Sequence, residues 1–287
     1  MRLYVADAHA ISRMWAYMGR AAKATYQDGC LAFSKGAAYS ALLAFFPIFT
    51  SIAAVLVQAN AESVSRTIAR LLYDVVPPGT EDVVRNLFIV KGQRPTSLLV
   101  AAVILAAWAG SGVMMSLMEG FRVIYRIPSG RSFVKERMVA LMLVFLTAIP
   151  VIGSSGLIVF GNRTQRWFVR WMGLARGESD LRGWVRLMGQ SVNFLIAVAA
   201  IVLALALIYH FGPNRRQSLS QVIPGAVLAT ILWLMSTAVF GWYIRYVANY
   251  NLIYGGVGAG LALLVWSYLL AVIAFFGCEY NAVRERQ

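Results

Sequence analysis

Long uncharged stretches dominate the hydrophobic pattern of this chain. Six segments of 24 to 33 residues contain no Asp, Glu, Lys or Arg: 36–61, 95–118, 138–162, 187–214, 217–244 and 246–278. An α-helix rises about 1.5 Å per residue, so about 20 apolar residues cross a hydrocarbon core about 30 Å thick. Each segment is therefore long enough to span a membrane. The pattern predicts an all-α integral membrane protein with six transmembrane helices.

The predicted spans form one transmembrane domain over residues 31–283, preceded by an N-terminal segment over residues 1–30. We place the spans at 37–57, 97–118, 138–160, 190–209, 222–244 and 255–278. In the N-terminal segment, apolar side chains share one helical face and basic ones lie off it: Ile11, Trp15, Met18 and Ala22 against Arg13, Arg20 and Lys23. This pattern predicts an amphipathic helix that lies in the plane of the lipid headgroups.

Two long connections, 58–96 and 161–189, are predicted to contain amphipathic loop helices at the membrane surface. Residues 64–76 carry apolar side chains at helical spacing before Pro77, and residues 166–188 are rich in Trp and Arg, a composition that suits the interface. The short connections indicate orientation. The 119–137 connection holds five Lys and Arg residues, whereas 245–254 holds only Arg245. This asymmetry favours cytoplasmic N- and C-termini.

Composition agrees with a membrane class and argues against nucleic acid as a partner. The chain is 60% hydrophobic and 13% charged, with a mean hydropathy of +0.67 and a net charge of +14. The positive charge is spread over every connection, as expected for residues that face anionic headgroups. We therefore expect membrane lipids as partners. Cys30 and Cys278 fall on the predicted cytoplasmic side, where a disulfide is not expected.

Catalytic motifs are not found in this sequence. The chain has only two histidines, no P-loop and no paired nucleophile and base, so we expect neither an enzyme nor a metal or other cofactor. Ionisable and polar residues near span ends are costly in a membrane and are the candidates for function. The candidate substrate-binding residues are Lys35, Tyr39, Glu119, Arg122, Arg126, Tyr209, Asn214, Arg215, Arg216, Tyr250, Asn251, Tyr254 and Glu279.

Each candidate also has a structural interpretation. In this interpretation, basic side chains such as Arg126 and Arg215 are anchors that reach the lipid headgroups and bind no substrate. Glu279 gains little from anionic headgroups, so we expect Lys35 as its partner in an ion pair. The Gly-rich segment 249–260 either lines a substrate path or caps the start of a tightly packed helix. Small residues at close spacing predict close helix packing at three pairs: Gly110 with Gly112, Gly153 with Gly156 and Gly256 with Gly260.

Several motifs resemble those of the YihY/virulence factor BrkB family over roughly residues 20–285. In the C-terminal half these are Tyr209-His-Phe-Gly-Pro-Asn-Arg-Arg216, Ile223-Pro-Gly-Ala226, Tyr250-Asn-Leu-Ile-Tyr254-Gly-Gly-Val-Gly258 and Gly277-Cys-Glu279-Tyr-Asn281. The first span, Ala37 to Pro47, is similar to the family's opening motif. Ala44 and Cys278 depart from the usual pattern, and the Asn that usually follows span two is replaced in Glu119-Gly-Phe-Arg-Val-Ile-Tyr125.

The resemblance implies a six-span bacterial inner-membrane protein with cytoplasmic termini. Members were once labelled ribonuclease BN, which the missing metal ligands argue against, and some are linked to serum resistance or to export of lipid or lipopolysaccharide precursors. The leading hypothesis is a protein that transports or positions an anionic, lipid-like substrate in envelope biogenesis. Basic residues would hold the headgroup, tyrosines and Asn251 would line the path, and Glu119 and Glu279 would carry protons. The alternative is a non-transporting scaffold that binds an envelope-assembly protein.

Overall fold

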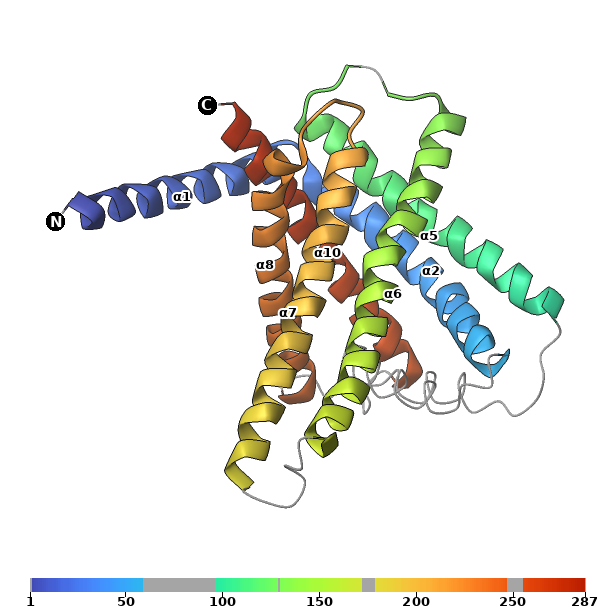
Figure 1. Ribbon diagram of the computed structural model, residues 1–287. Coiled ribbons are helices and arrows are strands. Elements are labelled where there is room, and N and C mark those ends of the chain that lie inside the picture. The colour runs from blue at the N-terminus through green and yellow to red at the C-terminus, as the bar shows by residue number, and fades with distance from the viewer. Residues whose placement is uncertain (1, 59–95, 129, 172–178, 247–254, 287) are drawn as a thin grey trace.

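The predicted all-α fold is confirmed by the structure, a computed structural model that describes residues 2–58, 96–128, 130–171, 179–246 and 255–286. The helices of these ranges are α1 (Arg2–Gln27), α2 (Cys30–Gln58), α5 (Thr96–Ile124), α6 (Phe133–Trp171), α7 (Ser179–Phe211), α8 (Leu219–Tyr246) and α10 (Gly255–Glu285) (Figure 1). Within the described ranges the chain has no strand.

Six of these helices are long and apolar enough to cross a membrane, as predicted. The apolar stretches are Cys30–Ser51, Leu99–Ile124, Phe133–Leu157, Met188–Phe211, Leu219–Ile244 and Gly260–Glu285. Several helices extend past the charges that bounded the predicted spans; α5, for example, continues through Glu119 and Arg122. A charged side chain ends an apolar segment without ending the backbone hydrogen bonds. For this reason the sequence placed helix ends too early.

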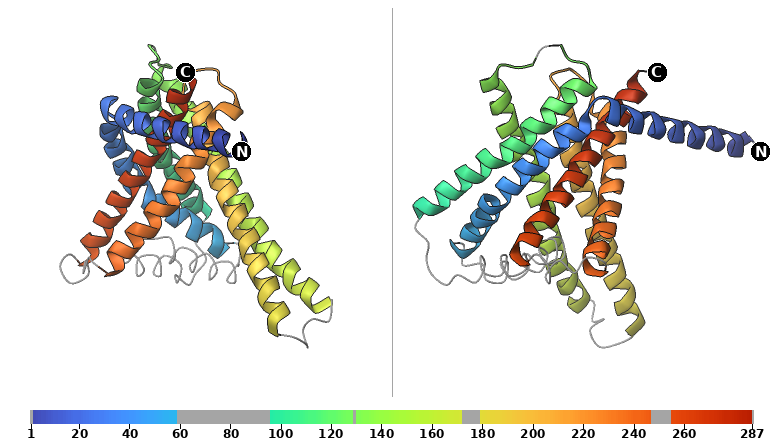
Figure 2. Two further views of the ribbon diagram at one scale, coloured as in Figure 1. Left: turned by 90° about the vertical axis from the view of Figure 1, so that its left-hand side faces the viewer. Right: turned by 180° about the vertical axis from the view of Figure 1, so that it is seen from behind.

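The membrane helices run in alternating directions and pack in pairs, α2 on α5, α6 on α7 and α8 on α10. Figure 2 shows the pairs meeting at one end of the bundle and spreading apart toward the other. We call the first the converging end; it contains the ends of α5, α7 and α10 and the beginnings of α2, α6 and α8. The opposite end is the diverging end.

Aromatic and small side chains fill the core at the converging end. Phe121 of α5, Tyr209 of α7 and Phe275 of α10 are fully buried. The ring of Phe121 contacts the other two edge-to-face, with centroid separations of 5.6 Å to Tyr209 and 5.7 Å to Phe275. Such geometry is favourable for aromatic pairs. The alanines of α8, Ala226 and Ala229, complete this core.

Two glycines allow α8 and α10 to cross with their backbones in contact. A Cβ on Gly225 would lie 2.1 Å from the carbonyl oxygen of Gly277, and one on Gly277 would lie 2.7 Å from that of Gly225. The glycine pairs predicted from spacing behave differently. A Cβ at Gly153, Gly156 or Gly260 would meet no described atom within 4 Å, so the predicted close packing is not seen among the described residues, and the side-chain surroundings of Gly256 lie outside the description. Gly110 and Gly112 do face neighbouring helices. A Cβ on Gly110 would lie 3.6 Å from the Val144 side chain, and one on Gly112 would lie 3.4 Å from the Ser40 hydroxyl.

Helix α1 has the bounds expected of the N-terminal helix and projects sideways from the bundle (Figures 1 and 2). Its C-terminal turns pack on α10, where Tyr17 meets Tyr280 edge-to-face at 6.3 Å. Trp15 is 63% exposed, and the position of α1 in the headgroup plane stays a prediction. The predicted loop helices have two outcomes. Residues 59–95 lie outside the described ranges, whereas α6 extends to Trp171 and α7 begins at Ser179, so most of 161–189 continues these two helices.

Candidate functional site

Three arginines connect the segments of the converging end in a closed ring, which we call the arginine clamp: Arg131, Arg215 and Arg286. Arg131, between α5 and α6, donates to the carbonyl oxygens of Gly212 (3.0 Å) and Phe211 (3.2 Å). Arg215, between α7 and α8, forms a 2.6 Å ion pair with Glu285 at the end of α10. Arg286 donates to the carbonyl oxygen of Ile124 at 2.5 Å, which returns the ring to α5.

The positions of these arginines follow from the chemistry of helix ends. The last carbonyl groups of a helix have no partner inside it and carry partial negative charge, so cations bind there favourably. Arg131 occupies the end of α7 and Arg286 the end of α5. Arg215 instead stacks its guanidinium group 4.3 Å above the ring of Tyr125. Burial, followed by the neighbouring Cys278, raises the pKa of Tyr125, so this ring is neutral at physiological pH.

Asn281 of α10 ties α10 to α8 at a proline. Pro224 lies inside α8 and removes one N–H from its hydrogen-bond ladder. The fully buried Asn281 side chain bonds to the backbone on both sides of that proline. Its amide nitrogen donates to the Val222 carbonyl at 3.0 Å, and its oxygen accepts from the Gly225 N–H at 2.7 Å. The Pro-Gly motif of α8 and the Asn of α10 thus act as one packing unit.

Glu279 is the outstanding buried group at the converging end. It is 0% exposed, and among the described residues neither carboxyl oxygen forms a hydrogen bond of accepted geometry. The charged side chains that act on it are Asp28, Arg286 and Arg126. A buried carboxylate without hydrogen bonds is costly, and an ionisable residue inside a membrane span is a functional candidate for this reason. Glu279 therefore remains the strongest of the predicted candidates.

The predicted ion pair between Lys35 and Glu279 is wrong. The side of α2 that faces the core carries Cys30, Ser34, Ala37 and Ala38, all buried. Lys35 and Tyr39, which are four residues apart, are both exposed on the other side of the helix. Glu279 lies on the inward face of α10 between buried neighbours, so the two side chains point to different environments. The sequence indicated which segments are helical, but it did not indicate the rotation of each helix about its axis.

Two further candidates, Tyr209 and Arg215, are held by protein groups. The Tyr209 hydroxyl donates to the Ala274 carbonyl at 2.7 Å, and the Tyr209 carbonyl accepts from the buried Gln217 side chain. Tyr209 thereby joins α7 to α10, and Arg215 belongs to the arginine clamp. Both residues position the converging end, and their exposed neighbours Asn214 and Arg216 are more accessible to a ligand.

The candidates at the end of α5 have three different environments. Glu119 is exposed, and Arg122 forms an ion pair of 3.6 Å with Glu136 of α6. Arg126 terminates the helix with a φ of 52°, in the left-handed region. The N–H of Arg126 bonds to the Val123 carbonyl at 3.0 Å, and the N–H of Ile127 bonds to the Arg122 carbonyl at 2.9 Å. This is a Schellman-type helix end, in which glycine usually occupies the position of Arg126.

Pockets lined by basic side chains surround these groups. One, of about 240 Å³, is lined by Arg131, His210, Phe211, Pro213, Arg215, Arg216 and Gln217. A second, of about 340 Å³ between α1 and α10, is lined by Arg20, Lys23, Ala24, Gln27, Val283 and Arg286. Neither lining contains an acidic residue. Such a concentration of positive charge favours an anionic ligand.

Some predicted residues lie outside the described ranges, and the structure adds others. Tyr250, Asn251 and Tyr254 fall in residues 247–254, which the structure does not describe. The additions are Arg131, Gln217, Glu285, Arg286, Asn281 and Asp28. In the sequence, Arg131 contributed only to the charge asymmetry of the loops, and Asn281 only to the C-terminal motif. Among the described residues no group of three or more His, Cys, Asp or Glu could hold a metal ion, and both cysteines are buried free thiols.

Comparison with known proteins identifies the family. Residues 21–287 match the family described as virulence factor BrkB. The chain therefore belongs to this family, as its motifs indicated.

Curated relatives are similar at low identity. The ribonuclease-like protein YfkH of Bacillus subtilis (strain 168) is 27% identical over 194 residues, which cover 68% of each chain. A UPF0761 membrane protein of Chromobacterium violaceum is 24% identical over 278 residues, 95% of this chain and 63% of that protein. One from Alkalilimnicola ehrlichii is 25% identical over 257 residues, 89% of this chain and 55% of its own length. The chain thus covers less than two thirds of the two UPF0761 proteins. No solved structure matches.

Proposed function

We propose that this multi-pass membrane protein transports or positions an anionic, lipid-like molecule, with the headgroup held at the converging end. The observation that carries the proposal is the pair of basic pockets without described acidic lining, each of which includes at least one arginine of the clamp. In this proposal the clamp arginines fix the geometry, because hydrogen bonds and an ion pair already hold them. Exposed cations such as Arg216 and Arg126 provide contacts to the ligand.

Glu279 provides the coupling group in this proposal. It is buried at the converging end, where Asp28, Arg286 and Arg126 act on it electrostatically, and among the described residues neither of its carboxyl oxygens forms a hydrogen bond of accepted geometry. Loss or gain of its proton changes the charge beside these arginines, and the position of a nearby anion responds to that charge. Glu119, the other predicted proton carrier, is exposed and therefore less suited to this role. The converging end faces the cytoplasm of a bacterial inner membrane in this proposal, and the process served is envelope biogenesis.

A lipid-flipping assay in proteoliposomes tests the function. Purified protein is reconstituted with a fluorescent anionic phospholipid, and loss of outer-leaflet fluorescence is followed after addition of a membrane-impermeant quencher. We expect the wild type to exceed empty liposomes, and Glu279→Gln, which keeps the side-chain volume, to slow flipping at least about tenfold, equivalent to about 1.4 kcal/mol of barrier. Arg284→Gln is the matched control, since Arg284 is exposed in the same turn region of α10. Equal rates for wild type and empty liposomes would overturn transport.

A static scaffold is the second candidate, and one observation favours it. At the crossing of Gly225 with Gly277 the backbones of α8 and α10 are in contact, which leaves no passage between these two helices at that level. A scaffold that binds an envelope-assembly protein needs no such passage. In the same assay, a scaffold predicts wild-type flipping no faster than empty liposomes.

A further inference from the structure

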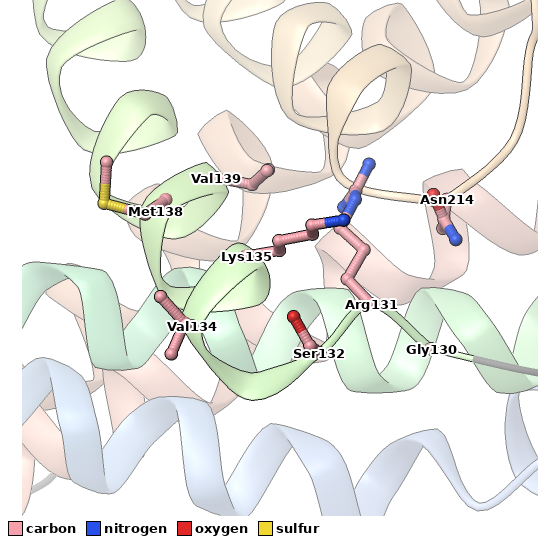
Figure 3. A pocket seen from close by; sticks show the side chains of 8 residues that line it. All are labelled: Gly130, Arg131, Ser132, Val134, Lys135, Met138, Val139 and Asn214. Atoms are coloured by element: carbon pink, nitrogen blue, oxygen red, sulfur yellow. The ribbon is translucent and has the colours of Figure 1, made fainter.

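A third pocket, the largest of the three described here, lies where α6 begins. It measures about 620 Å³ and is lined by Gly130, Arg131, Ser132, Val134, Lys135, Met138, Val139 and Asn214. Figure 3 shows Arg131 and Lys135 pointing into the space between α6 and the segment that carries Asn214. The pocket thus joins the α5–α6 and α7–α8 connections. Neither Arg131 nor Lys135 was among the residues that the sequence singled out.

The pocket has positive charge that the protein does not neutralise. Among the described residues Lys135 has no ion-pair or hydrogen-bond partner, and its neighbour Glu136 is paired with Arg122 at 3.6 Å. Arg131 is half-buried, and its guanidinium group donates to the end of α7. Burial lowers the pKa of Arg131, although Glu136 opposes this effect. Two cations that share one pocket repel each other, and a bound anion removes that repulsion.

The start of α6 adds to this attraction. The first N–H groups of a helix have no partner within it and carry partial positive charge, which favours a bound anion. The α6 ladder begins with the Glu136 N–H bonding to the Ser132 carbonyl at 2.9 Å, so the N–H groups before Glu136 precede the ladder. They lie beside the pocket walls formed by Ser132 and Val134.

An apolar stripe leads from the pocket along α6. Val134 and Met138 line the pocket, and the exposed apolar side chains continue at spacings of three and four residues. The stripe consists of Val134, Met138, Met142, Phe145 and Ile149, all exposed. These spacings place the side chains on one face of a helix. A ligand in the pocket therefore meets cations at one end and continuous apolar surface at the other.

We propose that this pocket binds the phosphate group of an anionic phospholipid, with the acyl chain along the α6 stripe. Lys135 contacts the phosphate oxygens, Arg131 adds its charge from the pocket wall while it remains bonded to the end of α7, Asn214 donates to the phosphate from the opposite wall, and Met138 contacts the first methylenes of the chain. The site deepens the proposed function, on which it rests for its role, since it names the ligand class and adds Lys135 to the residues that hold it.

Binding in detergent tests the site without any transport. Wild type and variants are titrated with a fluorescent short-chain phosphatidic acid, and fluorescence anisotropy gives the dissociation constant. We expect Lys135→Gln and Met138→Ser each to weaken binding about tenfold, which corresponds to about 1.4 kcal/mol. Arg284→Gln removes an equal charge from an exposed residue at the same end and leaves binding unchanged. Phosphatidylcholine of equal chain length competes poorly, because its net charge is zero.

Several outcomes would overturn the site. If Lys135→Gln binds as the wild type does, the pocket is not the binding site. If inorganic phosphate competes as well as the lipid and Met138→Ser has no effect, the pocket takes free phosphate. Failures of the two proposals differ. Unchanged binding by Lys135→Gln with active wild-type flipping removes only the site, whereas lost binding by Lys135→Gln with no wild-type flipping removes only the transport function.

Discussion

The two ends of the helix bundle are stabilised by different interactions. At the converging end, the arginine clamp, the Asn281 bonds to α8 and the Gly225–Gly277 crossing join α5, α7, α8 and α10. At the diverging end the helix pairs separate, and exposed apolar side chains such as Ile152, Leu195 and Trp242 cover them. Inside a bilayer, lipid tails are as apolar as leucine, so the burial of apolar side chains provides little driving force for helix association.

The comparison indicates where the geometry of this protein is determined. Hydrogen bonds and close backbone contacts have strict distance requirements, so they fix the helices at the converging end. Toward the diverging end the described contacts include a long hydrogen bond, from the indole N–H of Trp266 in α10 to the Thr237 hydroxyl of α8 at 3.4 Å, and the exposed apolar surface there tolerates different helix separations. In the proposed function, the pockets that bind a lipid headgroup need the fixed helix geometry of the converging end. Mutations at the two ends should therefore have unequal effects.

The largest difference is expected between two glycine-to-alanine substitutions in α8. Gly225→Ala places a Cβ 2.1 Å from a backbone oxygen that cannot move alone, and we expect a loss of about 3 kcal/mol or more in stability. Gly241→Ala, in the same helix toward the diverging end, meets no described atom within 4 Å and should gain about 0.5–1 kcal/mol through helix propensity. Thermal unfolding in detergent measures both.

Equal unfolding temperatures for these two variants would break the comparison. It would mean that the α8–α10 crossing is looser than its geometry requires. Size-exclusion chromatography of the same samples provides the control for aggregation, because an overpacked crossing lowers the yield of monodisperse protein as well as its stability.

A smaller effect is expected when Asn281 loses its hydrogen bonds. Asn281→Leu keeps a similar volume but leaves the buried Gly225 N–H and the Val222 carbonyl with one partner fewer, at a cost of about 1–3 kcal/mol. Asn214→Ala changes an exposed asparagine and should stay within about 0.5 kcal/mol of wild type. The unfolding midpoint of each variant measures these two stability changes. If Asn281→Leu matches Asn214→Ala, packing alone holds α8 against α10.

The number of membrane helices and their type were readable from the sequence, because long uncharged segments permit few alternatives. The contacts at the converging end were not. Gly225 and Gly277 belong to different helices, and their meeting depends on the rotation of both, which hydropathy does not report. Regular spacing instead favoured Gly153 and Gly156, which have no described neighbour.

For the candidate site, the sequence indicated which residue types to consider, but it did not indicate what surrounds each residue. Glu279 followed from the rarity of acids beside anionic headgroups, and the structure places it in the core. Its predicted partner Lys35 lies on the outer side of α2. Arg215 followed from its motif, but its contacts with Glu285 and Tyr125 require segments 70 and 90 residues away to meet. Such meetings are products of tertiary structure, and a single sequence gives no signal of them.

The smallest expected effect concerns two left-handed residues at the converging end, Arg126 at a φ of 52° and Gly29 at 68°. An L-residue with a Cβ is disfavoured in this region by roughly 1–2 kcal/mol, and glycine is not. Both Arg126→Gly and Arg126→Ala remove the positive charge near Glu279, so the difference between them isolates the backbone term. We expect the glycine variant to be more stable than the alanine variant by about 1 kcal/mol, after the unfolded-state entropy of glycine is included.

Gly29→Ala is the reciprocal test, because a Cβ there would meet no described atom and only the backbone conformation is changed. It should lose about 1 kcal/mol in the same unfolding measurement. If Arg126→Gly is more stable than Arg126→Ala and Gly29→Ala is less stable than the wild type, Arg126 occupies a strained backbone position that glycine would fill better. The charge of Arg126, which acts on Glu279, then accounts for an arginine at this position better than the helix end does. In that case Arg126→Gly should slow lipid flipping although it does not lower stability relative to Arg126→Ala. Equal stability of these two variants would show instead that the turn after α5 relaxes, and that the converging end is less rigid there than at its glycine crossing.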